Sequence, residues 1–469
     1  MHVLFDARLL HRPLSGLERV QKNLLRELAL LPGIRRLSVA VLRGTRLPQD
    51  FPQQAKVLEV DGGDDLLAHL LDPEPKARPD VYHLTYFPDR APHELLLPIA
   101  AKASVVEVHD AILNRHPEYH ASPAAHAAYD AFVRALVRSC DRLLVHSESV
   151  RGEVERDLGG DPQLCDLAPL AIDPDLARPL PAADVAARLA RLSVAGEYFV
   201  AIGKDYPHKD HATLFAALAQ VPRATLVCAG AKVWGQSSDE LLARLGIAAR
   251  VRFVQGLDDA DIQALLQGSK GLVYPSREEG FGLPPIEAMA LGVPVLAARA
   301  MSIPEVCGNG ALLFPPGDAA ALAGLLRQAL AGGKALAAQV ERGRQRAAWF
   351  SWRRCAEATF ASYERALAAS RGEARRRPVL TQELELALRL GATSPFRLAL
   401  EVAEQKRRAD ALEQHARAVE ANRDDILRQL DALRAAAGLA PVAPAAAPPR
   451  WSLKRRLGKI KNAIKKRLS

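Results

Sequence analysis

The feature that most constrains the fold is an alternation of short strand-like segments with longer helix-like ones, which runs twice along the chain. In the first part, short apolar runs predict strands at Val3–Ala7, Leu37–Leu42, Val81–Tyr86, Ser104–His109 and Arg142–Ser147. Helical periodicity separates several of them, at Leu17–Leu31 and Ala124–Arg138. Such alternation predicts a parallel sheet covered by helices, because parallel neighbours need crossover connections.

The alternation stops around Pro169–Pro181, where proline is frequent and periodicity is lost, which indicates a linker. It then resumes with predicted strands at Tyr198–Gly203, Thr225–Gly230, Val251–Gly256, Gly271–Pro275, Pro294–Ala298 and Ala311–Phe314. The chain is therefore predicted to be an α/β protein with two Rossmann-like, doubly wound domains that face one cleft.

Composition adds bounds to this prediction. At 469 residues the chain has room for two or three domains with a large core. Its five cysteines are scattered without metal-like spacing, which favours small buried hydrophobes in a reducing cytoplasm over disulfides. The N-terminus enters a strand pattern at once and lacks the layout of a signal peptide. No apolar stretch approaches the length of a membrane span, so a soluble or peripheral protein is expected.

The net charge of +9 comes from one short segment. Residues 450–469 hold nine Lys or Arg and no acid, so 63 − 9 leaves 54 basic residues against 54 acidic ones in residues 1–449. The excess positive charge therefore indicates what this tail binds, and it does not indicate a nucleic-acid substrate for the rest of the chain.

The most informative string runs from Tyr274 to Val295, YPSREEGFGLPPIEAMALGVPV. A buried strand is predicted to end at Tyr274, and a loop with two glycines leads to a helix that starts near Pro284, where proline suits the first helical position. Free N–H groups at such a helix start form a site for a phosphate. Glu279 and Glu287 flank this site, and carboxylates beside an anion site suit sugar hydroxyls. Alternatively, Glu287 is a capping residue at the third helical position and Glu279 a solvated loop charge.

The whole string closely resembles the donor-site signature of retaining glycosyltransferases of family 4. Two later segments share the resemblance, SIPEV at residues 302–306 and ALLFPPGD at residues 311–318. It covers roughly residues 1–370 and implies the GT-B fold, in which two Rossmann-like domains bind a nucleotide-sugar between them.

The resemblance implies roles for residues of the second domain. Lys204 and Lys209 follow the strand that ends at Gly203, and both match positions where the family places basic residues against the diphosphate. Lys204 stands where arginine is more common, and lysine supplies charge without a bidentate fork. Glu287 is implied to hold the ribose hydroxyls and Glu279 the donor hexose. The remaining donor-binding positions implied by the match are Gly203, Phe281, Gly282 and Leu283, the last three through their backbone.

In the first domain, the resemblance places a glycine loop at Ser15–Gly16, with Gly16 near the diphosphate. The family often has two adjacent glycines, and this chain has one. His109 ends a predicted strand and matches a histidine that faces the donor sugar and the acceptor. Further histidines, His83, His116 and His146, are given no role.

The function implied is transfer of a hexose from a nucleotide-diphosphate donor to a hydroxyl, with retained anomeric configuration. Mannose from a GDP donor, and a lipid-linked or oligosaccharide acceptor in O-antigen or capsule synthesis, are the preferred assignments. No cofactor and no metal are expected, because the lysines and the helix start would serve the diphosphate. Two alternatives remain: a nucleotide-sugar epimerase or hydrolase on a similar fold, and a non-catalytic membrane-associated scaffold.

The residues beyond 370 lie outside the resemblance. Apolar residues recur at heptad spacing over residues 398–433, which indicates a coiled coil that joins a second copy or a partner enzyme, or else a single packed helix. Residues 450–469 have the pattern of an amphipathic helix, with leucines, isoleucines and Trp451 on one face and lysines and arginines on the other. This pattern favours binding to an anionic membrane. The protein is thus expected in the cytoplasm, peripheral on the inner face of the bacterial inner membrane.

These patterns predict seven regions along the chain. They are a first Rossmann-like domain (1–172), a linker (173–195), a second Rossmann-like nucleotide-sugar domain (196–348), a closing helix that packs back on the first domain (349–370), a helical or coiled-coil extension (371–437), an Ala/Pro-rich linker (438–449) and a basic amphipathic tail (450–469).

Overall fold

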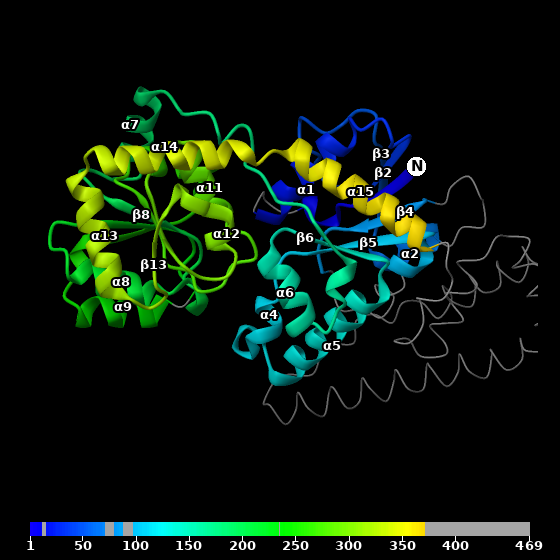
Figure 1. Ribbon diagram of the computed structural model, residues 1–469, viewed down its shortest axis with the longest axis horizontal. Coiled ribbons are helices and arrows are strands. Elements are labelled where there is room, and N and C mark those ends of the chain that lie inside the picture. Colours follow the sequence, from blue (N-terminus) through cyan, green and yellow to red (C-terminus); the bar gives the residue numbers. More distant parts are fainter. Residues whose placement is uncertain (12–15, 71–78, 88–96, 234, 371–469) are drawn as a thin grey trace, which may run out of the picture. The chain divides into compact units, whose positions relative to one another are not determined.

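The computed structural model describes residues 1–11, 16–70, 79–87, 97–233 and 235–370. All of these residues belong to one compact unit. They form two parallel sheets flanked by helices, as Figure 1 shows. The predicted coiled coil at 398–433, the linker at 438–449 and the basic tail at 450–469 lie outside the described residues.

The first sheet has the strand order β3-β2-β1-β4-β5-β6-β7, and every pairing in it is parallel. Its strands are β1 (His2–Asp6), β2 (Arg36–Leu42), β3 (Lys56–Val60), β4 (Val81–Leu84), β5 (Ala103–Val108), β6 (Arg142–Val145) and β7 (Cys165–Leu167). The helices between them are α1 (Gly16–Leu28), α2 (Gly63–Leu70), α3 (Leu97–Ala100), α4 (Ile112–Arg115), α5 (Pro123–Ser139) and α6 (Glu148–Arg156).

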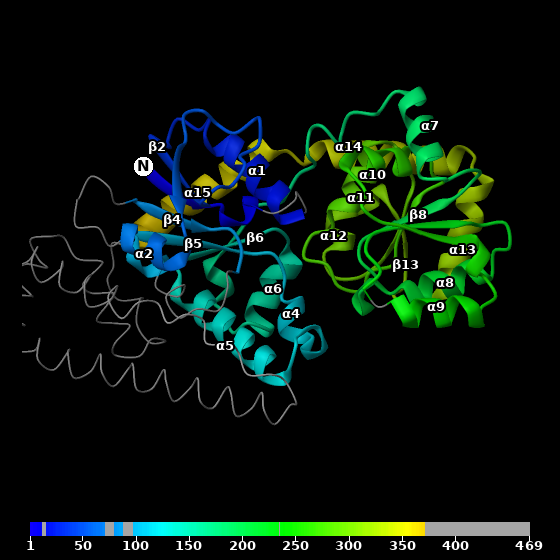
Figure 2. The ribbon, with the colours of Figure 1, turned by 180° about the vertical axis from the view of Figure 1, so that it is seen from behind.

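Both faces of this sheet are covered, as a parallel sheet requires. Val3 and Phe5 of β1 share a core with residues of α1, on the face where α15 (Trp352–Ser370) also packs. Leu4 of β1 points to the opposite face, in a second core with Phe132 and Leu136 of α5. Figure 2 shows α1 and α15 side by side over the sheet. Helix α15 thus returns to the first sheet after the chain has completed the second.

The second sheet has the order β10-β9-β8-β11-β12-β13, again parallel throughout. Its strands are β8 (Phe199–Ile202), β9 (Leu226–Ala229), β10 (Val251–Val254), β11 (Leu272–Tyr274), β12 (Val295–Ala298) and β13 (Leu312–Phe314). Its helices are α8 (His211–Ala219), α9 (Gly235–Arg244), α10 (Asp259–Gln267), α11 (Leu283–Ala290), α12 (Ile303–Cys307), α13 (Ala319–Ala331) and α14 (Lys334–Trp349).

The predicted fold class is confirmed, since two parallel sheets with flanking helices form as expected. The structure adds β3 and β7, which the sequence analysis did not predict. It also forms α7 (Ala182–Arg191) inside residues 173–195, where a linker was expected. Among the described residues, no helix is both long and apolar enough to cross a membrane.

The topology indicates where a ligand binds. In each sheet the strand order reverses beside the domain's first strand, between β1 and β4 and between β8 and β11. Open α/β sheets bind ligands at the carboxyl ends of the strands at such a switch point. The candidate residues follow the ends of β5, β8 and β11, and so lie at these edges.

Candidate active site

The loop between β11 and α11 forms the second sheet's part of the site. Gly282 adopts φ = +91°, a left-handed conformation that suits glycine, and directly precedes α11 at Leu283. A Cβ on Gly282 would lie 2.7 Å from the Cδ1 atom of Ile303, so the position is also tightly packed. Pro284 and Pro285 in the first turn carry no N–H, so the donors that this helix start offers are the N–H groups of Gly282 and Leu283, and residue 282 provides no side-chain cap. A helix start of this kind is a binding site for an anion.

Lys209 and Glu279 form an ion pair beside this helix start. Lys209 ends a short 3-10 helix (Pro207–Lys209) after β8, and its Nζ lies 5.6 Å from the centre of the Tyr274 ring. The two charged side chains are only 19 % and 11 % exposed, so solvent screens the pair weakly. The sequence analysis assigned both residues to the donor, and the structure brings them into contact.

The two loops that carry this pair are tied together. The Arg277 N–H donates to the His208 carbonyl at 2.8 Å, and the Ser276 hydroxyl donates to the same carbonyl at 3.3 Å. Asp210, which caps α8 through the N–H of Thr213, accepts a bond from Arg277 Nε at 2.8 Å. The relative position of Lys209 and Glu279 is therefore fixed by backbone contacts as well as by their charges.

Glu287 lies on α11 and is 5 % exposed. Its Oε1 is 3.7 Å from Nη1 of Arg19 on α1. Burial raises the pKa of Glu287 to about 7. The positive charge of Arg19 lowers this pKa, and the negative charges of Asp259 and Asp173 raise it further. With α11 starting at Leu283, Glu287 lies beyond the third helical position, which argues against the capping interpretation.

His109 directly follows β5 and belongs to the first sheet's part of the site. Its Nε2 donates to the Thr85 carbonyl at 2.8 Å and lies 3.3 Å from Oε2 of Glu107. The backbone of Gly280 packs so closely here that an added Cβ would lie 1.7 Å from the His109 carbonyl oxygen. The loop that holds Glu279 thus touches the backbone of His109, and glycine is required at the point of contact.

A buried polar cluster lies beneath His109. Glu107 of β5 is fully buried, and its Oε1 lies 3.0 Å from Nε2 of His83. Nε2 of His146 lies 3.8 Å from Oε2 of Glu107, and the Tyr363 hydroxyl is 2.6 Å from Nδ1 of His83. The sequence analysis gave His83 and His146 no role. The available signal was a charged residue inside the apolar run Val105–Val108, which is unusual for a central strand.

Ligand-type atoms of Glu107, His109 and His146 lie within 4.8 Å of one another, the spacing at which side chains can share a cation. Burial raises the pKa of Glu107, but the imidazoles of His109, His146 and His83, which face its carboxyl group, lower it more, so that the net pKa is well below its usual range. These surroundings therefore favour the ionised form of the carboxyl group.

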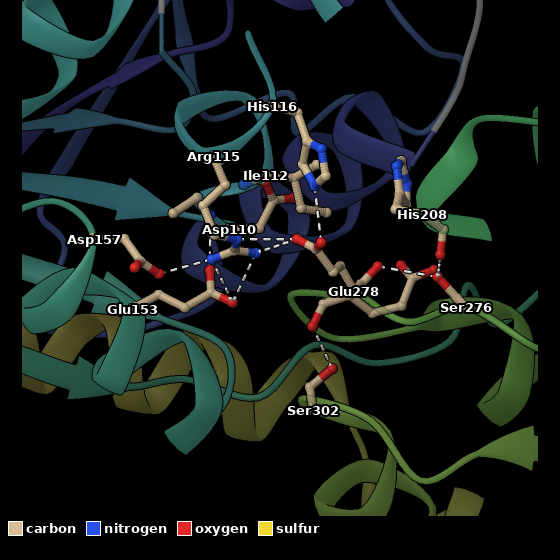
Figure 3. A network of polar contacts seen from close by, with 12 residues as sticks. Asp110, Ile112, Arg115, His116, Glu153, Asp157, His208, Ser276, Glu278 and Ser302 are labelled. Carbon is tan, nitrogen blue, oxygen red and sulfur yellow. Dashed lines mark hydrogen bonds and ion pairs between the residues drawn. The ribbon is translucent and has the colours of Figure 1, made fainter. Parts of the chain in front are cut away.

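Figure 3 shows a second polar network, in which residues after β5 hold the loop after β11. Glu278, the neighbour of Glu279, accepts hydrogen bonds from Arg115 Nη2 at 2.6 Å and Nε at 3.0 Å. Nε2 of His116 lies 2.8 Å from the other carboxylate oxygen. Arg115 Nη1 also donates to Asp157 at 2.7 Å. Glu278 thus fixes the loop of Glu279 to the first sheet's edge.

Further contacts join the same two regions. The Ser147 hydroxyl donates to the Gly280 carbonyl at 2.7 Å, and the Tyr119 hydroxyl is 2.9 Å from Nδ1 of His208. The Ser302 hydroxyl donates to the carbonyl of Glu279 at 2.8 Å. These bonds hold the backbone on both sides of Glu279.

Other expected site residues differ in their surroundings. Lys204 is exposed. Gly203 has φ = +128° and packs tightly against Gly230, where an added Cβ would lie 2.1 Å from the Gly203 carbonyl oxygen. The ring of Phe281 packs edge-on against Phe350 in the core, so that only its backbone can meet a ligand. Gly16 begins α1, and a Cβ there would meet nothing within 4 Å.

Comparison with known proteins gives a family model and several relatives. Residues 192–346 match the family model described as glycosyl transferases group 1. The chain is 26 % identical to O-antigen chain mannosyltransferase B of Escherichia coli over 388 residues, 78 % of this chain and 100 % of that protein. It is 32 % identical over 242 residues to an MMP alpha-(1->4)-mannosyltransferase of Mycolicibacterium hassiacum, 50 % of this chain. The match spans 56 % of that second relative.

Solved structures show the same fold. HepE from Anabaena, determined in complex with UDP and glucose, superposes with a TM-score of 0.60 at 21 % identity, covering 78 % of this chain and 99 % of HepE. WaaG, described as a glycosyltransferase involved in lipopolysaccharide biosynthesis, gives 0.56 at 17 % identity over 77 % of this chain and 98 % of WaaG.

The fold and the sequence matches therefore indicate a two-sheet enzyme of the GT-B class. The chain is a glycosyltransferase, with a group 1 glycosyl transferase domain at residues 192–346. The expected family resemblance is confirmed at this level, and the matches do not support the epimerase or hydrolase alternative.

Proposed function

We propose that this glycosyltransferase moves a hexose from a nucleotide-diphosphate sugar to a hydroxyl of a glycan acceptor, and that it retains the anomeric configuration. The observation that carries the proposal is the Lys209–Glu279 pair at the start of α11, with Glu287 on the same helix. A cation and free N–H groups suit the diphosphate, and two carboxylates suit the hydroxyls of ribose and hexose.

The residues have separate tasks in this reaction. The bond between the anomeric carbon and the diphosphate oxygen breaks, and a bond from the same carbon to the acceptor oxygen forms. Lys209, Lys204 and the start of α11 stabilise the charge that develops on the leaving diphosphate. The acceptor's proton passes to a leaving phosphate oxygen on the same face of the sugar. Glu279 positions the hexose and does not attack it.

Mannose from a GDP donor is the preferred assignment, and surface polysaccharide synthesis the preferred context. The names of two relatives, an O-antigen chain mannosyltransferase and an alpha-(1->4)-mannosyltransferase, support the sugar. The acceptor proposed is a lipid-linked or oligosaccharide chain.

A ligand screen tests the donor. We expect one of the GDP-, UDP-, ADP- and dTDP-sugars to raise the melting temperature most, since a ligand that binds the native state at a given concentration stabilises it more the tighter it binds. That donor is then incubated with and without a polysaccharide acceptor. Transfer that needs the acceptor supports the proposal. Epimerisation or hydrolysis of the donor alone, at the rate seen with acceptor, would contradict it.

Residues 450–469 are proposed to hold the enzyme on an anionic membrane at the cytoplasmic face, where a lipid-linked acceptor would lie. Their nine basic residues and apolar stripe support this. Flotation with anionic liposomes should recover the full chain and lose the chain that ends at residue 449. Equal recovery of both would refute it.

Residues 398–433 are proposed to join a second copy or a partner enzyme as a coiled coil, on the basis of their heptad spacing. Light scattering on the chain with and without this segment tests the first possibility. If both chains have the same number of copies per particle, self-association through this segment is excluded.

A further inference from the structure

The cluster beneath His109 contains a charge that needs a balancing partner. Glu107 is fully buried in the inner strand β5, and Nε2 of His83 and of His109 lie 3.0 and 3.3 Å from its carboxylate oxygens, which holds its pKa well below the usual range. An unpaired carboxylate in the protein interior is too costly to persist, so a positive charge must accompany it. The three neighbouring imidazoles, those of His83, His109 and His146, and a bound metal are the candidates.

Hydrogen positions favour a proton over a metal. Nε2 of His109 is 2.8 Å from the Thr85 carbonyl, and a carbonyl only accepts, so this nitrogen carries hydrogen and has no lone pair for a metal. Nδ1 of His83 faces the Tyr363 hydroxyl, which can donate to it and leave a hydrogen on Nε2 toward Glu107. The cluster is therefore built to hold one extra proton on an imidazole.

His109 is the better holder of that proton. Its Nε2 lies 3.3 Å from Glu107, whereas that of His146 lies 3.8 Å away. Burial lowers the pKa of His109, but the nearby carboxylate of Glu107 and the hydrogen bond to the Thr85 carbonyl outweigh this, and the net pKa is raised. Burial lowers the pKa of His146, with a further contribution from the charge of His109, and the net pKa is lowered.

The second nitrogen of His109, Nδ1, has no hydrogen-bond partner among the described residues, and the side chain is 18 % exposed. We propose that Glu107 is a positioning residue: it keeps His109 as an imidazolium whose Nε2–H is fixed on the Thr85 carbonyl. The Nδ1–H is then presented to an oxygen of the bound nucleotide-sugar. This role rests on the proposed function, because it requires a donor in the adjacent site.

Several other charged groups face His109 and must be considered in any pH experiment. His146, which follows β6, stacks near it with ring centres 4.8 Å apart. Asp110, the next residue, raises the pKa of His109 through its charge. Asp110 in turn interacts with Glu279 and Lys209 across the site. Because His146 and these groups titrate too, the test must follow the His109 ring itself.

The first measurement needs no variant. NMR titration of the histidine rings in the full chain should show His109 protonated to a higher pH than the ordinary value of about 6.5, and His146 neutral over most of that range. Glu107→Gln should move the His109 transition to lower pH. An unchanged His109 transition in Glu107→Gln would overturn the proposal, whether or not any donor is turned over.

The second measurement is the pH dependence of kcat/KM. Glu107→Gln should lower kcat/KM by up to about 10–100-fold between the pH of the variant's His109 transition and that of the wild type, the usual effect of losing one hydrogen bond from a charged group. Near pH 5.5, where an ordinary histidine is protonated in any case, most of the loss should be recovered. A loss of the same size at every pH would indicate a merely structural role and would overturn the proposal.

Two controls separate this effect from general damage. Asp166→Asn removes another buried carboxylate of the same sheet, one that pairs with Arg142, and should leave the alkaline limb of the profile in place. In a His109→Gln background, Glu107→Gln should have little further effect on kcat/KM, because the two residues act as one unit. A stoichiometric transition metal that is lost in Glu107→Gln would also overturn the proposal. If the wild-type protein transfers no sugar, the proposed function fails, and the NMR titration still decides the role of Glu107.

Discussion

The two sheets share one topology but differ at their carboxyl edges. The first sheet buries a carboxylate among histidines, with Glu107 fully enclosed between His83 on β4 and His146 after β6. The second sheet instead places Lys209 and Glu279 on loops, partly exposed and paired with each other. The comparison indicates a division of labour. The second sheet supplies two paired charges that face the site and are held by contacts between their loops, and the first supplies a fully buried carboxyl group beneath His109.

Replacing the lysine of the second sheet gives the largest expected effect. Lys209→Met should lower kcat about 10²–10³-fold, the typical cost of removing one group that stabilises a developing negative charge. Steady-state transfer assays measure it. Lys270→Met is the matched control, because Lys270 precedes β11 at the opposite edge of the sheet and pairs with the exposed Glu197. A similar loss in both variants would break the assignment of charge stabilisation to Lys209.

Glu287 gives a smaller effect with a distinctive pH dependence. Its pKa of about 7 means that the carboxylate takes up a proton as the pH falls below 7, and a protonated carboxyl accepts hydrogen bonds from ribose less well. Nucleotide affinity in calorimetry should therefore weaken from pH 8 to pH 6. Glu287→Gln should weaken it about 10–100-fold at pH 8 and remove most of this pH dependence. Glu341→Gln, on the exposed surface of α14, is the control.

The smallest expected effect concerns the contact between the two edges. Glu278→Gln should lower the free energy of unfolding by about 1 kcal/mol at pH 7, the upper range for a partly exposed ion pair. Burial raises the pKa of Glu278, but hydrogen bonds from Arg115 and His116 lower it more. Because the pKa of Glu278 is lower in the folded protein, its carboxylate stabilises the fold at pH values above the pKa of the unfolded chain. The difference in free energy of unfolding between the wild type and Glu278→Gln should therefore shrink as the pH falls through the acid range.

Denaturant unfolding at two pH values measures this contribution. Glu357→Gln removes an exposed helical pair on α15 and should cost no more than about 0.5 kcal/mol. A Glu278→Gln variant that matches this control at neutral pH would show that the contact does not stabilise the fold.

Much of the second sheet's site could be predicted from the sequence. Glu279 and Glu287 lie within one continuous string, and a strand, a glycine loop and a helix start follow each other in it. Local rules for strand ends and helix starts therefore suffice to bring these residues to one edge. The same rules placed Lys209 after β8, at the neighbouring strand end.

The cluster around Glu107 could not be predicted in the same way. His83, Glu107 and His146 belong to segments that become neighbours only through the strand order β4-β5-β6. No spacing in the sequence encodes this order, and a lone histidine near a strand end is usually structural. The strands at the sheet's edges were missed for a different reason: β7 has three residues, and β3 mixes exposed and buried positions. None of the residues of α7 is buried, so this helix has no core-facing residues from which it could have been predicted.

Sugar transfer by a Glu279→Ala variant decides whether Glu279 holds the donor hexose. With the donor that stabilises the protein best, the initial rate of sugar transfer and the affinity for the free nucleotide are measured side by side. Our account predicts a transfer rate reduced at least about 100-fold with nucleotide affinity retained, because Glu279 holds the hexose and Glu287 the ribose. A variant that transfers sugar at the wild-type rate would contradict it.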